Sequence, residues 1–193
     1  MRPKVLSGRF YARDTAVVAR GLLGKVLVRR LGGESLGGVI VETEAYYGVD
    51  DPASRAYHGR KRYNAAMFGE PGRLFIYNVH RYWMLNFVAH EPGEVGGVLV
   101  RALEPTIGVE EMMRNRPVGR LEDLTSGPGR LTVALGVDKS LDGSPVDGES
   151  CPVYVLDNRL DFEVGRSGRI GVSRDLPVEL RFYVKGNGFV SRR

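Results

Sequence analysis

The stretch Gly38-Val-Ile-Val-Glu-Thr-Glu-Ala-Tyr46 decides the fold, because it has the composition of one long strand that carries two acids and an aromatic ring. Strand side chains alternate between two faces, and the pattern therefore predicts one face with Ile40, Glu42, Glu44 and Tyr46. The opposite face, turned toward the core, is expected to hold Val39, Val41, Thr43 and Ala45. On this pattern alone, a solvated strand face is favoured over a carboxylate pair that performs acid–base chemistry.

Length and composition indicate one globular domain over residues 1–193. With 193 residues and 42% hydrophobic content, the chain can bury the core of one sizeable domain, and no stretch has the composition of a linker. No apolar run approaches the roughly 20 residues that span a bilayer, and the N-terminus lacks a secretory hydrophobic stretch. We therefore expect a soluble, cytoplasmic, monomeric protein, associated with the nucleoid if the source is prokaryotic.

The content of cysteine and histidine argues against disulfides and metal. The single cysteine, Cys151, excludes an internal disulfide, and only three histidines, His58, His80 and His90, are present. These residues leave little from which to build a zinc site, and we expect no structural metal.

The net charge of +5 and a pI of about 9.5 favour a polyanionic partner. One basic zone consists of Arg55, His58, Arg60, Lys61 and Arg62. A second zone consists of Arg166, Arg169, Arg174, Arg181, Lys185, Arg192 and Arg193. The two zones either line one groove or form two solvated loops, and charge alone does not choose between them. Binding to nucleic acid would weaken steeply with added salt.

The segments that flank the opening stretch predict a helix and a hairpin. Asp14 is a candidate N-cap for a helix with an apolar face of Val18, Ala19, Leu22 and Leu23 that ends at Gly24. Residues 25–31 resemble a strand, and the turn at Gly32-Gly33 would make the opening stretch the second arm of a hairpin.

The remaining elements predict an α+β fold. Residues 47–73 are rich in Gly, Pro, Arg and Asn and predict a long loop of the kind that usually binds or covers something. Strands are predicted over the segments 74–88, 97–103, 153–156 and 179–184, and helices over 109–114 and from Ser126 onward. Because the predicted helices and strands do not alternate as in repeated βαβ units, the sheet should be mainly antiparallel.

Ser126 and Pro128 have the spacing of a helix N-terminus. The exposed amides of such a terminus can receive a phosphate, although an ordinary capped helix is the more frequent outcome.

The segment 74–86 combines aromatic and polar residues, including Tyr77, Tyr82 and Trp83. An enzyme that acts on a flipped nucleobase needs ring faces and a few polar groups, although such rings are more often core residues. Arg101 interrupts an apolar strand and needs an acceptor, for which Glu104 and Glu44 are candidates.

Seven blocks in order resemble the alkyladenine (3-methyladenine) DNA glycosylases of the AAG/MPG type. They are Gly-Val-Ile-Val-Glu-Thr-Glu-Ala-Tyr at 38–46, Asp-Pro-Ala-Ser at 51–54, Arg-Tyr-Asn-Ala-Ala-Met-Phe at 62–68, Pro-Gly-Arg-Leu-Phe-Ile-Tyr at 71–77, Val-Leu-Val-Arg-Ala-Leu-Glu-Pro at 98–105, Thr-Ser-Gly-Pro-Gly-Arg-Leu at 125–131 and Leu-Arg-Phe-Tyr-Val-Lys-Gly at 180–186. The likeness covers residues 8–192, and several ordered blocks are far more specific than any one of them. It implies one mixed domain around a curved, mainly antiparallel sheet, as in the C-terminal domain of formyltransferases.

The resemblance also implies an activity and its residues. The activity is hydrolysis of the N-glycosidic bond of a damaged purine flipped from double-stranded DNA, by a monofunctional enzyme without metal or cofactor. Glu44 matches the general base and Arg101 the arginine that helps to hold the attacking water. Tyr46 and Tyr77 match the stacking tyrosines, Asn86 the asparagine that excludes guanine, and Leu99 belongs to the base pocket. Contacts to the DNA backbone are expected from Arg60, Lys61, Arg62, Arg81, Ser126 and Arg130.

Two positions depart from the family pattern. Arg55 stands where the family has a base-pocket histidine, and His58 follows three residues later. The segment that carries the family's DNA wedge is one residue shorter, so that Val79 or His80 would have to fill the gap. A smaller or more polar wedge should hold the duplex open less well, which disfavours neutral lesions.

Two other function classes stay open from the residues alone. One is a hydrolase of free nucleosides or sugars that uses Glu42 and Glu44 as its acid–base pair, and the other is a basic nucleic-acid-binding module without catalysis. For Glu42, pairing with a nearby arginine is preferred over an electrostatic role in catalysis. Lys61 and Lys185 lie in basic runs, which argues against a Schiff-base lyase.

Overall fold

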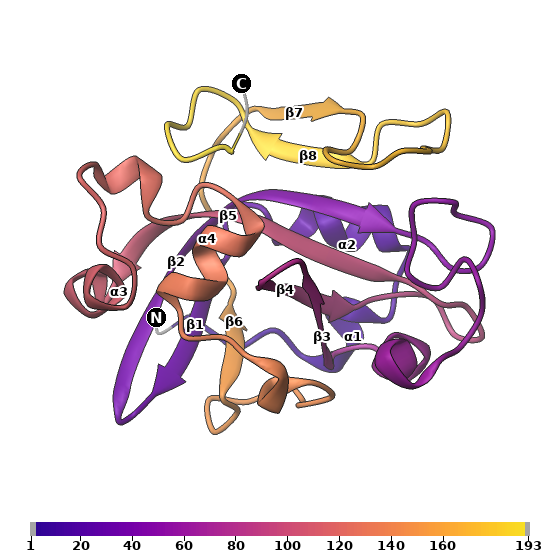
Figure 1. The fold of residues 1–193 in the computed structure, drawn as a ribbon, viewed down its shortest axis with the longest axis horizontal. Coiled ribbons are helices and arrows are strands. Elements are labelled where there is room, and N and C mark those ends of the chain that lie inside the picture. The colour runs from indigo at the N-terminus through magenta and orange to yellow at the C-terminus, as the bar shows by residue number, and fades with distance from the viewer. Residues whose placement is uncertain (1–2, 192–193) are drawn as a thin grey trace.

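A branched antiparallel sheet, centred on the strand predicted from the opening stretch, organises the fold (Figure 1). The computed structural model describes residues 3–191. The strands are β1 (Val26–Leu31), β2 (Glu34–Tyr46), β3 (Leu74–Val79), β4 (Tyr82–Val88), β5 (Gly97–Ile107), β6 (Val153–Leu156), β7 (Val164–Ser167) and β8 (Arg181–Val184). Their order is β3-β4-β5-β2-β1-β6, with β8 also paired to β2 and β7 paired to β8. The predicted α+β class with a mainly antiparallel sheet is confirmed.

Short helices lie between the strands and against the sheet (Figure 1). They are α1 (Gly8–Tyr11), α2 (Thr15–Leu22), α3 (Val109–Asn115) and α4 (Pro128–Ala134), with 3-10 helices η1 (Arg62–Phe68), η2 (Leu121–Asp123) and η3 (Lys139–Leu141). Among the described residues, no helix has the length and apolarity that crossing a membrane requires.

Helix α2 follows the sequence prediction closely. The Asp14 carboxylate accepts a hydrogen bond from the Val17 amide at 2.9 Å, which satisfies one of the free N–H groups at the helix start. The buried face of α2 packs against β2, so that the helix covers the core side of the central strand. Gly24 follows the helix with a positive φ of 76°, as its predicted role at the helix end requires.

The sheet branches along β2. Strand β5 runs along one edge of β2 from Gly37 to Tyr46. The other edge pairs first with β1, as the predicted hairpin, and then with β8 over Glu42, Thr43 and Glu44. Glu42 and Glu44 consequently have a strand on each side, and neither residue is exposed to solvent. The expectation of a solvated strand face is therefore wrong.

A β-bulge at Val41 changes which residues face the core. Ile40 pairs with Leu103 and Glu42 with Ala102, which leaves Val41 as an extra residue on β2. An extra residue shifts the alternation of side chains by one position. Ile40 therefore joins Ala45 in the main core, whereas Val39 and Val41 pack around Val190 in a small separate cluster. The predicted alternation is correct from Glu42 onward and wrong before the bulge.

Four other elements differ from the sequence prediction. The segment 74–88 is a hairpin of β3 and β4 with a turn at His80, which has a positive φ of 53°. The predicted loop over 47–73 contains η1, and β7 was not predicted. Helix α4 begins at Pro128 with Gly127 as its N-cap, so Ser126 is not the cap. Its hydroxyl accepts a hydrogen bond from Arg130 instead.

Close approach of β2 and β5 at Gly38 predicts a large effect of a single methyl group. A Cβ atom on Gly38 would lie 2.1 Å from the carbonyl oxygen of Glu104, so Gly38→Ala must displace one of the two strands. We expect a loss of at least about 2 kcal/mol in the free energy of unfolding, measured by urea denaturation. The control is Gly119→Ala, whose Cβ meets nothing within 4 Å and should change stability by less than about 0.5 kcal/mol. Equal stability of both variants would contradict the packing.

Candidate active site

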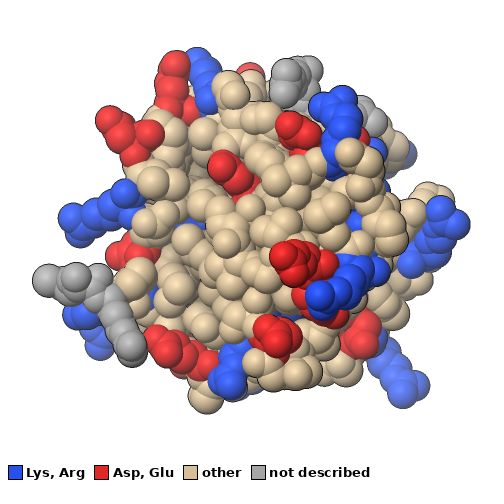
Figure 2. Space-filling model, turned by 90° about the vertical axis from the view of Figure 1, so that its left-hand side faces the viewer, with Lys and Arg blue, Asp and Glu red and all other residues tan. Residues whose placement is uncertain are grey.

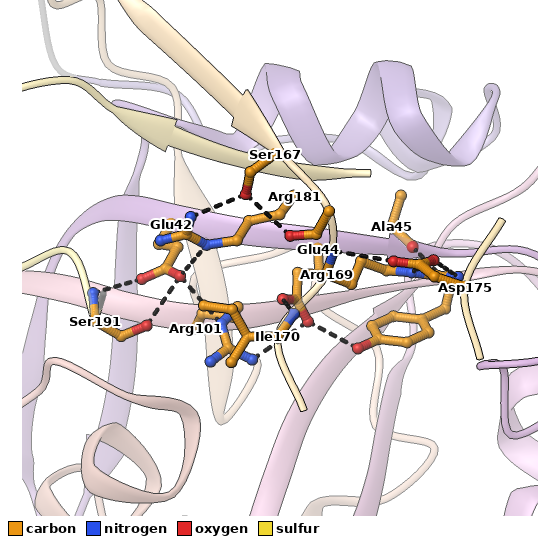
Figure 3. Close-up of polar contacts among 12 residues, drawn as sticks. Glu42, Glu44, Ala45, Arg101, Ser167, Arg169, Ile170, Asp175, Arg181 and Ser191 are labelled. Carbon is orange, nitrogen blue, oxygen red and sulfur yellow. Dashed lines mark hydrogen bonds and ion pairs between the residues drawn. The ribbon is translucent and has the colours of Figure 1, made fainter. Parts of the chain in front are cut away.

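The carboxylate of Glu44 lies at the centre of a buried polar cluster (Figure 3). Arg101 on the neighbouring strand β5 donates from Nη1 to Oε2 of Glu44 at 3.3 Å. The hydroxyl of Tyr46 donates to the same oxygen at 2.7 Å, and the amide of Ile170 donates to Oε1 at 2.7 Å. Three donors from two strands and a distant loop thus hold one carboxylate.

Glu42 shares Arg101 with Glu44. Arg101 Nε lies 3.1 Å from Glu42 Oε1, and Arg181 Nε lies 2.7 Å from the same atom. Ser191 adds its amide at 2.6 Å and its hydroxyl at 2.9 Å. Of the two candidate partners of Arg101, Glu44 is confirmed, and so is the preference for pairing at Glu42. The alternative partner Glu104 is wrong, because its carboxylate accepts from Asn187.

Burial explains the protonation state of Tyr46. Removal from water, followed by the charge of Glu44 and the hydrogen bond to it, raises the pKa of the Tyr46 hydroxyl far above its usual value. The phenol therefore stays neutral and keeps donating to the carboxylate at physiological pH.

A cavity of about 500 Å³ opens beside this cluster. Its walls come from the loop after β2, the β3–β4 hairpin, β5, the start of α4 and the loop before β8. Among the predicted site residues, it is lined by Tyr46, Arg55, Tyr77, Val79, Leu99 and Arg101. Since Tyr46, Arg101 and Ile170 line the cavity and also contact Glu44, the carboxylate lies directly behind the cavity wall.

The ring of Tyr77 is covered on the cavity side and the core side. Its centroid lies 5.0 Å from that of Phe75, and the Arg55 guanidinium carbon lies 4.7 Å from it. Burial raises the pKa of the Tyr77 hydroxyl, with Arg55 acting in the opposite direction.

A small void of about 10 Å³ adjoins Tyr46, Tyr77 and Asn86. The Asn86 carboxamide nitrogen donates to the carbonyl oxygens of Phe75 and Met84, which holds this side chain in place.

The residues predicted to contact DNA backbone lie outside the cavity wall. Arg60 and Lys61 are exposed on the loop that leads into η1, and Arg62 is exposed at the start of η1. His80, a predicted wedge residue, is exposed at the β3–β4 turn. The guanidinium carbon of Arg81 lies 5.2 Å from the centroid of the Tyr82 ring. Arg130 binds Asp123 at 3.0 Å, in addition to Ser126. No contact joins these side chains to the Glu44 cluster.

The second basic zone is only partly a surface feature. Arg169 and Arg181 are buried in ion pairs, and the idea that the whole zone lines a groove is therefore wrong. Arg192 and Arg193 lie outside the described residues. On the face drawn in Figure 2, acidic and basic side chains are interspersed, so the net positive charge does not gather into one patch there.

Two parts of the site were missed by sequence reasoning. One is the amide of Ile170, which bonds to Glu44 across 126 residues of sequence, and the other is the ion pair of Arg169 with Asp51 and Asp175. The contact of Ile170 is made by its backbone amide, so the type of its side chain does not reveal it. Asp51 and Arg169 both stand out as charged residues, but nothing in their spacing shows that they meet.

Within residues 3–191, no group of three or more His, Cys, Asp or Glu side chains is arranged to hold a metal ion.

Comparison with known proteins identifies the family. A relative from Aeropyrum pernix is 44% identical over 98% of this chain and 94% of its own length, and one from Mesorhizobium japonicum is 46% identical over 92% and 86%. Both carry the name "Putative 3-methyladenine DNA glycosylase", as does a Clostridium perfringens relative that is 40% identical over 95% of this chain and 97% of its own length. The protein therefore falls in the class of hydrolases that act on N-glycosyl bonds.

The family itself follows from a match over most of the sequence. The model of the methylpurine-DNA glycosylase (MPG) family matches residues 9–188. The chain belongs to this family, as the ordered sequence blocks predicted.

The buried cluster predicts a strong dependence of stability on Glu42. Glu42→Leu leaves Arg101 and Arg181 buried without this carboxylate, and we expect a loss of about 3–5 kcal/mol in the free energy of unfolding, measured by urea denaturation. The control is Glu163→Gln, which removes the partner of Lys185 at the surface and should cost less than about 1 kcal/mol. A Glu42→Leu variant as stable as this control would show that the cluster does not stabilise the fold.

Proposed function

We propose that the protein excises alkylated purines from double-stranded DNA by hydrolysis of the N-glycosidic bond, with water activated by Glu44. The observation that carries this proposal is the Glu44 carboxylate, held by three donors directly behind the wall of a 500 Å³ cavity. Family membership supplies the class of bond and the DNA substrate. The enzyme is monofunctional, works as a monomer without a metal or cofactor, and acts in the cytoplasm, associated with the nucleoid if the source is prokaryotic.

Glu44 acts as the general base in this proposal. An ionised carboxylate offers about four acceptor directions, and the donors from Arg101, Tyr46 and Ile170 take three of them. Because Glu44 is fully buried, the remaining direction accepts a hydrogen bond from the water that attacks C1′ of the deoxyribose only after the cavity wall in front of it opens. The negative charge of Glu44 also stabilises the oxocarbenium-like transition state, and Arg101 holds the water together with Glu44.

The aromatic rings at the cavity receive the base. A purine with an alkylated ring nitrogen is cationic, which makes it a good leaving group and a good partner for the electron-rich faces of Tyr46 and Tyr77. Asn86 crowds the exocyclic amine of guanine, and Leu99 packs against the base. Arg55 has donors only, so it reads acceptor atoms on the base edge after leaving its place over Tyr77.

The DNA backbone is bound by exposed basic residues around the cavity. These are Arg60, Lys61, Arg62, Arg81 and Arg130, together with the hydroxyl of Ser126. The β3–β4 hairpin enters the space left by the flipped nucleotide, with Val79 at the cavity and His80 at the exposed turn.

The direct test of the proposal is Glu44→Gln. The amide keeps the shape of the side chain but cannot accept a proton from water, so we expect base release from 7-methylguanine-containing duplex to fall at least about a hundredfold. Binding of the same duplex should be retained. The measurements are single-turnover release of the free base and fluorescence anisotropy of labelled DNA.

Glu104→Gln is the matched control, because Glu104 lies on β5 and bonds to Asn187 rather than to the Glu44 cluster. It should release base at the wild-type rate. A Glu44→Gln protein that also kept the wild-type rate would overturn the assignment of the general base, and a wild-type protein that binds the duplex but releases nothing would be a binding module.

The short hairpin predicts a lesion preference. A small wedge holds a duplex open poorly, so the cationic lesions 3-methyladenine and 7-methylguanine, whose bonds are weakened by the charge itself, should be released at least about tenfold faster than hypoxanthine or ethenoadenine. Single-turnover rates on four duplexes of one sequence measure the preference. Similar rates for all four lesions would refute it.

A further inference from the structure

We propose that Arg169 is a positioning residue for base excision, which acts by fixing the loop that donates the Ile170 amide to Glu44. This inference rests on the proposed role of Glu44 as the general base. It assigns Arg169, a member of the basic zone near the C-terminus, to the interior of the active site rather than to the DNA-binding surface.

Arg169 is anchored by two carboxylates. Its side chain is 0% exposed, as is that of Asp51, which accepts Nη1 at 2.6 Å and Nη2 at 2.7 Å. Asp175 accepts Nε at 2.9 Å and Nη2 at 2.6 Å. Burial disfavours the charge of Arg169, but hydrogen bonds to Asp51 and Asp175 outweigh it and raise the pKa of the guanidinium. The group therefore stays charged inside the protein.

The same guanidinium holds the central strand at the two residues that follow Glu44. Nη1 donates to the carbonyl oxygen of Ala45 at 2.9 Å (Figure 3). The guanidinium carbon lies 4.6 Å from the centroid of the Tyr46 ring. The residue after Arg169 is Ile170, whose amide donates to Glu44 at 2.7 Å. The Arg169 side chain thus ties two consecutive residues of β2 to the loop before β8, and the next residue of that loop binds Glu44.

Every donor of Arg169 is used in this arrangement. A guanidinium has five N–H groups, and the contacts to Asp51, Asp175 and Ala45 account for all of them. No N–H group is left for a DNA phosphate. The planar fork that makes these contacts cannot be reproduced by an ammonium group, which has three donors from a single point.

The consequence for catalysis is geometric. With the loop fixed, the Ile170 amide holds one oxygen of Glu44, and Tyr46 and Arg101 hold the other. The carboxylate therefore has one orientation toward the cavity before DNA binds. If the loop shifts, Glu44 loses a donor and its orientation, and the attacking water is misplaced.

The test compares Arg169→Gln with Arg29→Gln. Arg29 is also buried, and it donates only to the backbone carbonyl oxygens of Arg30, Pro152 and Gly136, none of which lines the cavity. Single-turnover base release from 7-methylguanine duplex should fall about ten- to a hundredfold in Arg169→Gln, while duplex affinity changes by less than about threefold. Arg29→Gln, which removes another buried guanidinium, should release base at the wild-type rate. Equal rates for the two variants would overturn the inference.

A double-mutant cycle separates positioning of Glu44 from a general structural effect. If Arg169 acts through Glu44, Arg169→Gln should lower the residual rate of Glu44→Gln by less than about twofold. The same fold-loss in both backgrounds would refute the inference and leave the role of Glu44 intact. A Glu44→Gln single variant with the wild-type rate would instead refute the proposed function itself.

A milder variant covers the case in which Arg169→Gln does not fold. Asp175 is 25% exposed, and Asp175→Asn keeps its shape while it removes one of the two charges that hold Arg169. We expect Asp175→Asn to slow base release about tenfold in the wild-type background and to have no effect in Glu44→Gln. An Asp175→Asn protein with the wild-type rate would contradict the proposal.

Discussion

The salt bridges of Arg101 with Glu42 and Glu44 are the interaction on which the rest of the structure depends. Glu42 and Glu44 lie on one strand without solvent exposure, where their negative charges would repel each other. Arg101 on the next strand contacts both, with Nε 3.1 Å from Glu42 Oε1 and Nη1 3.3 Å from Glu44 Oε2. Arg181 and Ser191 complete the shell of Glu42. Tyr46 and Ile170 complete the shell of Glu44. We propose that the first carboxylate serves the fold and the second serves chemistry.

The branching of the sheet makes this arrangement possible. Strand β2 exchanges β1 for β8 along one edge, and the bulge at Val41 lies where the exchange occurs. Before the bulge the strand contributes Ile40 to the main core, and after it the strand directs Glu42, Glu44 and Tyr46 to the polar side. The cavity then forms between the end of β2, the β3–β4 hairpin and the loop that carries Ile170.

Local signals in the sequence predicted the local structure, and long-range contacts were harder to infer. The cap at Asp14, the hairpin of β1 and β2 and the alternation of Glu42, Glu44 and Tyr46 depend on neighbours in sequence. The contact of Arg101 with Glu44 followed from the cost of burying a charge. The bulge depends on strand pairing, and the pair Arg169–Asp51 joins residues 118 apart, so neither leaves a pattern in the sequence. Glu104 was an equally charged candidate for Arg101, and only the folded structure shows that its carboxylate binds Asn187 instead.

The most direct test is a crystal structure of the wild-type protein bound to duplex DNA in which a cationic pyrrolidine replaces one deoxyribose as a mimic of the oxocarbenium ion. The account predicts one ordered water about 2.6–3.2 Å from the Glu44 carboxylate, also bonded to Arg101 and facing the atom that replaces C1′. A pyrrolidine bound away from Glu44, or one with no room for a water between the two groups, would contradict it.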